Sequence, residues 1–170
     1  MDNQLSLMSK DKKSPSNGKK PRADGQMSGL SGELFVAAEL LKRGCQASIT
    51  FGNAKSIDLL VHNPRIDRTF TVQVKALRNP NYFLLRHSAV GKNHIYVFVL
   101  LNKPDEPVKY YVVPGSILHS EPKRFDRWFL DEKMPGIHSK TLDAMPEFVN
   151  AWSHFEDPRL ANSGVPQIES

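Results

Sequence analysis

Cysteine and long apolar runs are nearly absent from this sequence of 170 residues. The single cysteine, Cys45, excludes an intrachain disulfide and a zinc site built from several thiolates. The six histidines are dispersed without the spacing of metal ligands, so we assign none of them to zinc. The longest apolar run, IYVFVLL, is far too short to cross a bilayer, and no apolar stretch near the start resembles a signal peptide. We therefore expect a cytoplasmic protein without a membrane segment.

The net positive charge is also small outside the first 27 residues. Residues 1–27 hold six Lys or Arg and three Asp, which leaves 17 basic and 15 acidic residues elsewhere. The net charge of +5 suits a polyanionic partner, but basicity alone does not identify nucleic acid. Few apolar residues occur in 1–27, so burial cannot offset the entropy lost on ordering it. We predict a disordered basic tail at 1–27, one domain at 28–156 and a flexible C-terminal tail at 157–170.

The first element of the predicted domain is an amphipathic helix over 28–44. Ser28 would cap this helix and Gly44 would end it. Its apolar side chains recur at helical spacing and would face the core: Leu30, Leu34, Ala38 and Leu41. With Leu34 at the centre of that face, Glu33 falls near one edge and Glu39 on the wet side.

Strand-like segments follow the helix and predict a mixed sheet. They are expected at 46–51, 56–62, 69–77, 95–101 and 108–113. The state of 82–87 stays open, a short helical turn is expected at 114–118, and 121–142 has an irregular pattern. A last helix from Pro146 would place Phe148, Trp152 and Phe155 on one stripe. This order predicts an α/β (α+β) fold in which helices flank a central mixed β-sheet of about five strands.

Polar residues on two neighbouring strands fall on one face. In SIDLLVH and TFTVQVKA the apolar residues alternate with Asp58, Gln73 and Lys75. A hairpin register that pairs Leu59 with Val72 brings the apolar sets together and sets Asp58 opposite Gln73. Cross-strand neighbours of this kind lie roughly 4.5 to 5.5 Å apart. A shift of two residues in either direction would keep Asp58 within the same patch.

The predicted polar patch has the chemistry of a site for a hard cation. Asp58, Gln73 and Lys75 would lie together, and Glu33 would join them if the first helix covers this part of the sheet. Carboxylate and amide oxygens suit Mg²⁺, which keeps several waters and accepts one or two carboxylates besides substrate phosphate. A lysine beside such a cation would orient a water or stabilise charge on a phosphoryl oxygen.

Glu33 on a helix, Asp58 on a strand and Gln73-Val74-Lys75 on the next strand resemble the PD-(D/E)XK nuclease superfamily, in its variant with glutamine in the second motif. The segments YFLLRH, IYVFVLL and KYYVVP and the Trp-containing end extend the resemblance to small uncharacterised bacterial members, over roughly 28–156. It implies a Mg²⁺- or Mn²⁺-dependent phosphodiesterase acting on nucleic acid, with DNA as the expected substrate. Members of this superfamily often work as dimers, although no part of the sequence identifies an interface.

The resemblance also implies roles for individual residues. Asp58, Gln73 and Glu33 would bind the metal, and Lys75 would be the catalytic lysine. The sequence departs from the common pattern at Gln73, which replaces an acid and lowers the number of negative ligands from three to two. A nuclease-fold module that binds nucleic acid or a protein without cleavage is the alternative, and chemistry on RNA or a small nucleotide is a third hypothesis.

Basic residues outside the motif offer candidate contacts to phosphate. These are Arg86, His87, Lys123, Arg124 and Arg127. In KRFDRWF, the cations would bind phosphates while Trp128 stacks on a base. In the opposite interpretation, which we favour, the segment docks its aromatic rings onto the core and leaves its charges in solvent.

Overall fold

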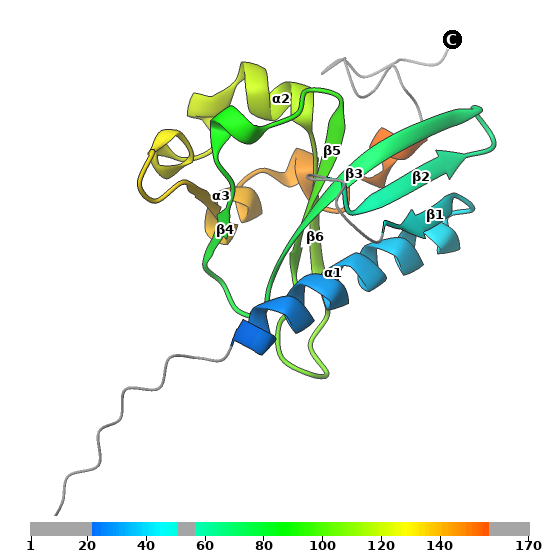
Figure 1. The fold of residues 1–170 in the computed structure, drawn as a ribbon, viewed down its shortest axis with the longest axis horizontal. Helices are drawn as coiled ribbons and strands as arrows, with labels where there is room; N and C mark the ends of the chain where they lie inside the picture. Colours follow the sequence, from blue (N-terminus) through cyan, green and yellow to red (C-terminus); the bar gives the residue numbers. More distant parts are fainter. Residues whose placement is uncertain (1–21, 51–56, 157–170) are drawn as a thin grey trace, which may run out of the picture.

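A five-stranded mixed sheet forms the centre of the structure, a computed structural model that describes residues 22–50 and 57–156 (Figure 1). Its strands are β1 (Gln46–Ile49), β2 (Leu59–Asn63), β3 (Arg68–Leu77), β5 (His94–Leu100) and β6 (Lys109–Pro114), in the order β1-β2-β3-β5-β6. Strands β3 and β5 are parallel, and the other neighbours are antiparallel. Helix α1 (Arg22–Lys42) lies along one face of this sheet. The predicted fold class, a mixed sheet flanked by helices, is confirmed.

The predicted hairpin register is also confirmed. Leu59 lies opposite Val72 and Val61 opposite Phe70. All four are buried in one core, because the period-2 alternation of the two strands puts their apolar side chains on the same face.

Helix α1 differs from its prediction in both start and orientation. It begins at Arg22 instead of Ser28, and Ser28 is a buried residue inside the helix, so 22–27 are helical and Ser28 is not the cap. The large apolar side chains expected in the core are about half exposed: Leu30 (49%), Leu34 (52%) and Leu41 (55%). The residues 1–21 of the predicted tail lie outside the described residues.

The reason for this orientation is a close contact between α1 and β3. A Cβ on Gly32 would lie 2.5 Å from the Cβ of Ala76, so the helix approaches the sheet along its glycine. Val36 and Leu40, which follow Gly32 at helical spacing, are fully buried on the same side. A search for large apolar residues overlooks such a face because glycine adds nothing to hydrophobic periodicity.

The two faces of the sheet carry two separate cores. Strand β5 contributes to both, as expected for an apolar run covered on each side. Ile95, Val97 and Val99 belong to the core under α1, whereas Tyr96 and Phe98 belong to the opposite core.

Short elements cover the face opposite α1. They are β4 (Tyr82–Leu84), η1 (His87–Ala89), α2 (Gly115–Ser120), η2 (Pro122–Arg124), η3 (Arg127–Leu130), β7 (Gly136–His138) and α3 (Ser139–Asp143). Strands β4 and β7 pair as a second, antiparallel sheet, which decides the state of 82–87 that the sequence left open. The three-residue β7 was not expected, because a strand this short shows no periodicity. Within the described residues, no helix has the length and apolar character that a membrane span requires.

The predicted last helix is wrong. Two 3-10 turns, η4 (Pro146–Phe148) and η5 (Trp152–Phe155), stand in its place. Asn150 between them has a positive φ of 52° and donates its backbone N–H to the carbonyl of Tyr110 at 2.9 Å. The chain thereby crosses the edge strand β6, and Phe148 enters one core while Trp152 enters the other. The predicted C-terminal tail, 157–170, lies outside the described residues.

Candidate active site

Asp58 lies directly before β2, and its carboxylate is held against β3. Its Oδ2 accepts a hydrogen bond from the backbone N–H of Val74 at 2.7 Å, and its own N–H donates to the carbonyl of Val72 at 2.9 Å. Gln73 lies between these two partners. Oδ1 of Asp58 accepts no hydrogen bond from any described residue and is available to a ligand.

Glu33, on α1, provides the second carboxylate of the site. It follows Gly32, the point at which α1 contacts Ala76 of β3, and its side chain is half-buried. This partial burial raises the pKa of the Glu33 carboxyl, and the negative charge of Asp58 raises it further. The carboxylates of Glu33 and Asp58 therefore lie within electrostatic reach of each other.

Gln73 and Lys75 alternate with the buried Val72 and Val74 along β3. In the parallel register they lie beside Tyr96 and Phe98, on the face opposite the α1 core. Both side chains are half-buried. Lys75 forms no ion pair or hydrogen bond with the described part of the chain, so no carboxylate neutralises its ammonium there.

The donor set fits a hard divalent cation with few protein ligands. No group of three or more His, Cys, Asp or Glu that could hold a metal occurs within 22–50 and 57–156. The two carboxylates and the Gln73 amide oxygen are oxygen donors, and Mg²⁺ accepts such a sparse set because it retains waters and binds substrate phosphate. A cation would also offset the two causes that raise the pKa of Glu33, its partial burial and the neighbouring charge of Asp58.

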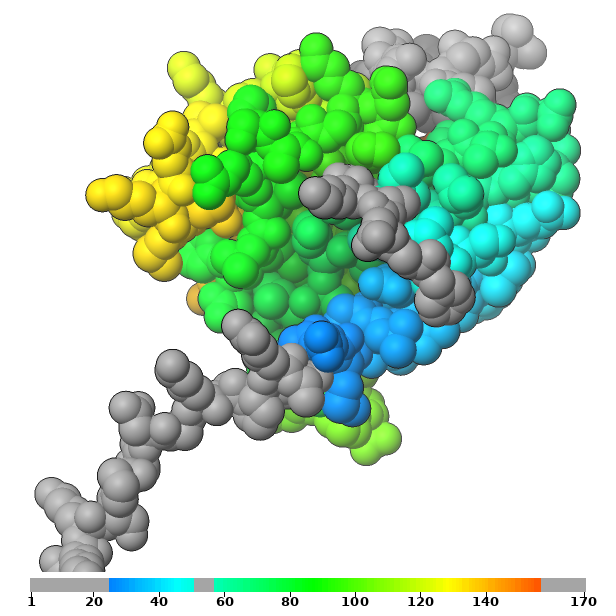
Figure 2. Space-filling view, in the orientation of Figure 1, coloured from blue at the N-terminus to red at the C-terminus, as the bar shows by residue number. Residues whose placement is uncertain are grey.

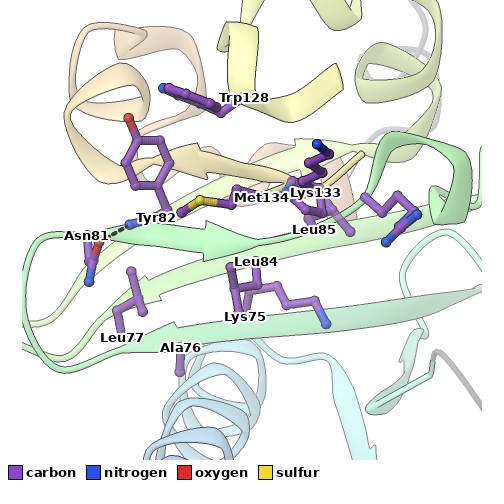
Figure 3. Close-up of a pocket in the computed structure, with 12 residues that line it drawn as sticks. Lys75, Ala76, Leu77, Asn81, Tyr82, Leu84, Leu85, Trp128, Lys133 and Met134 are labelled. Carbon is purple, nitrogen blue, oxygen red and sulfur yellow. Dashed lines mark hydrogen bonds between the residues drawn. The ribbon is translucent and has the colours of Figure 1, made fainter. Parts of the chain in front are cut away.

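Lys75 also lines a groove of about 920 Å³ between β3, β4 and the segment 128–135 (Figure 3). The other cations of its lining are Arg86 and Lys133, and no carboxylate among the described residues lines it. Figure 2 shows the yellow segment beyond η2 next to the green part of the chain that contains β4, in a view that also shows α1 in blue. Lys75 therefore belongs both to the predicted motif and to this cationic surface.

The predicted phosphate contacts Arg86 and His87 have different surroundings. Arg86 lines the groove. His87 packs on the rings of His119 and Phe129, with centroids 5.5 and 5.3 Å away.

The cations of KRFDRWF have different surroundings. Arg124 is bound in ion pairs with Glu121 and Glu147. Lys123 is exposed at a separate depression, and Arg127 lies over the ring of Trp128, 4.7 Å from its centroid. Phe125 and Phe129 dock onto the core as predicted, whereas Trp128 is half-buried and lines the groove.

The groove also contains residues that the sequence did not indicate. Tyr82, Lys133 and Met134 come from β4 and from the loop before β7. These segments are about fifty residues apart in the chain and are joined by the pairing of β4 with β7. The sequence offered one signal for this groove, the apolar segment YFLLRH with its arginine. That segment alone does not show that β4 pairs with β7.

Comparisons with known proteins give two structural similarities. No protein-family model matches the sequence, and no curated protein matches it. The chain is similar to Hjc, a Holliday junction resolvase from Archaeoglobus fulgidus, with 20% identity over 68% of this chain and 88% of that chain and a TM-score of 0.44. It is also similar to a bacterial homing endonuclease, with 16% identity over 82% of this chain and 98% of that chain and a TM-score of 0.48. The function proposed below is inferred from the residues of the site.

Proposed function

We propose that this protein is a Mg²⁺- or Mn²⁺-dependent nuclease that hydrolyses phosphodiester bonds in DNA. The observation that carries the proposal is that Asp58, whose charge acts on Glu33, accepts a hydrogen bond from the residue before Lys75, a lysine that no carboxylate of the described chain neutralises. Two acids and a free ammonium beside a cationic groove match the needs of phosphodiester hydrolysis, in which negative charge builds on the phosphate.

Each residue of the site has a proposed role. Asp58 and Glu33 would hold the cation, and the Gln73 amide oxygen would be a neutral third donor. When bound, the cation would supply Lewis-acid stabilisation and a more acidic water. The hydrogen bond from Val74 fixes the Asp58 carboxylate before substrate arrives. Lys75 would bind the scissile phosphate and stabilise the charge that develops on its oxygens.

Gln73 makes the affinity for metal depend on substrate. With two carboxylates in place of three, the free site attracts a divalent cation less strongly. It also repels phosphate less, so the substrate's own oxygens would complete the metal's coordination. We therefore expect weak binding of metal to the free protein and tighter binding in the presence of DNA.

Replacing the lysine tests the proposal. We expect Lys75→Ala to lower the rate of Mg²⁺- or Mn²⁺-dependent cleavage at least about 100-fold, because charge stabilisation at the phosphate is lost. Its Tm should change little, since Lys75 makes no ion pair with described residues. Cleavage would be measured on linear, circular, single-stranded and branched DNA.

Two further variants define the outcome. Asp58→Ala should also abolish cleavage, whereas Lys103→Ala, which removes an exposed lysine in the loop between β5 and β6, should leave it unchanged. Cleavage that persists in both Lys75→Ala and Asp58→Ala would exclude this site as the active site.

A binding module is the second candidate function, and Gln73 is the observation that favours it. If wild type binds DNA with either metal but cleaves none of the four substrates, and the Asp58 and Lys75 variants behave alike, the module is the correct interpretation. The absence of any binding would contradict both candidates.

A further inference from the structure

The groove beside Lys75 has the charge of a site for an extended anion. Its three cations come from separate segments: Lys75 from β3, Arg86 from the turn between β4 and η1, and Lys133 from the loop before β7. None of them forms an ion pair with a carboxylate in the part of the chain that the structure describes. The nearest exposed acid in the sequence of that loop, Glu132, is not part of the lining. The three ammonium and guanidinium groups are therefore available to successive phosphates.

The same groove exposes apolar and aromatic surface that phosphates alone would not use. Leu84 is 73% exposed and Met134 72% exposed, and both line it together with Tyr82 and Trp128 (Figure 3). Arg127 lies over the ring of Trp128, and no aromatic ring of the described residues stacks on that indole. Large exposed apolar side chains next to free cations indicate a ligand that is anionic along one edge and flat and apolar along the other.

The segment 126–134, which carries Trp128, Lys133 and Met134, is held in place by two aspartates. Asp126 accepts from the backbone N–H of Trp128 at 3.1 Å, and its other oxygen accepts from the Thr141 hydroxyl at 3.3 Å. Asp131 accepts from the backbone N–H groups of Lys133 and Met134, both at 2.8 Å. The carboxylates are therefore used to shape the loop, and the backbone at Trp128 and Lys133 is held in place before any ligand binds.

We propose that this groove binds an unpaired strand of nucleic acid, so that the substrate of the site is DNA with a single-stranded segment. Unpaired bases have free π-faces to stack on Trp128 and Tyr82 and to contact Leu84 and Met134, while the phosphates contact the three cations. A duplex keeps its bases stacked on one another and presents sugar and phosphate, which leaves the apolar part of the groove unused. The shared residue Lys75 would place the unpaired strand next to the carboxylate pair, and to this extent the inference depends on the proposed function.

Binding in EDTA tests the groove without cleavage. Labelled single-stranded and duplex oligonucleotides of equal length would be titrated with wild type and Trp128→Ala at several salt concentrations. We expect Trp128→Ala to lower the affinity for the single strand roughly tenfold and to change the affinity for the duplex less than about twofold, because stacking of one base is lost. Lys133→Ala should weaken binding and lower the salt dependence by about one phosphate contact.

Three controls separate stacking from folding and charge. Trp128→Phe keeps a ring and should retain most of the affinity, and Lys103→Ala removes an exposed cation outside the groove and should change nothing. In a Trp152→Phe background, quenching of Trp128 fluorescence by the single strand would report stacking directly.

The possible outcomes are distinct from those of the cleavage test. The inference would be overturned if Trp128→Ala lost no affinity for the single strand, or lost equal affinity for single strand and duplex. It would also be overturned if the groove bound a protein and no nucleic acid. Selective binding of the single strand by a protein that cleaves nothing would support the groove while contradicting the proposed nuclease activity. Cleavage of duplex alone, unaffected by Trp128→Ala, would support the nuclease and overturn the groove.

Discussion

At the scale of single residues, the surroundings of the Glu33 carboxyl disfavour its ionised form. Partial burial and the neighbouring charge of Asp58 both raise its pKa above 4.5. The folded state therefore binds this proton more tightly than the unfolded chain does. The contribution of Glu33 to the free energy of unfolding is therefore greatest below pH 4.5, and it falls as the pH rises through the pKa of the folded state. A residue that costs stability at neutral pH in this way has the profile of a functional group.

Replacing Glu33 by Gln should therefore separate stability from activity. Glu33→Gln removes the unfavourable charge while keeping the shape, so we expect an equal or slightly higher Tm at pH 7 and a smaller gain between pH 7 and pH 4 than in wild type. Cleavage should fall, because one ligand charge is lost. Thermal melts across this pH range measure the first effect. A lower Tm at pH 7, with wild-type activity, would show that Glu33 is structural.

At the scale of elements, the contact between α1 and β3 positions the site. Gly32 allows the helix backbone to approach Ala76 closely enough to put the next residue, Glu33, near Asp58. A side chain at position 32 would separate the helix from the sheet. The same glycine explains why α1 turns its leucines outward, so one small residue determines both the packing and the site.

Two glycines of the same helix form a matched pair for testing this contact. Gly32→Ala places a Cβ 2.5 Å from that of Ala76 and should destabilise the fold by about 1–3 kcal/mol, with a loss of cleavage. In Gly29→Ala the new Cβ meets nothing within 4 Å, so this variant should gain up to about 1 kcal/mol from higher helix propensity and keep its activity. Urea denaturation measures both. Equal effects of the two substitutions would rule out close packing at Gly32.

At the scale of the whole molecule, the segment 146–156 connects the two cores. Phe148 stacks on Phe125 with centroids 5.9 Å apart on one side of the sheet, and Trp152 packs edge-on against Tyr110 at 5.2 Å on the other. The bridge between Tyr111 and Val149 fixes the crossing at the sheet edge. The two cores are joined through the backbone of the sheet, and these two aromatic anchors belong to different clusters.

Mild substitutions of these anchors should therefore add. Phe148→Leu and Trp152→Phe are each expected to cost about 1–2 kcal/mol through imperfect packing. The double variant should cost their sum to within about 0.5 kcal/mol, because the two side chains share no core. Urea denaturation with an unchanged m-value would measure this. A coupling energy above 1 kcal/mol would show that the two faces respond as one packing unit.

The strands of the central sheet, their mixed arrangement and the shared facing of β2 and β3 were predictable from sequence, because alternation with period 2 is a local pattern. The same alternation located Asp58 beside Gln73. The buried face of α1 was not predictable, since it depends on Gly32 meeting Ala76 from a distant strand.

Only the tertiary structure decided what surrounds the motif. The proximity of Glu33 to Asp58 depends on how closely the helix packs, and the groove depends on the pairing of β4 with β7. Both are contacts between segments far apart in the chain, for which local pattern carries no information. The motif residues were therefore identifiable from the sequence alone, whereas the cationic, aromatic surface around Lys75, and the lack of an ion pair between Lys75 and the described residues, depend on folding.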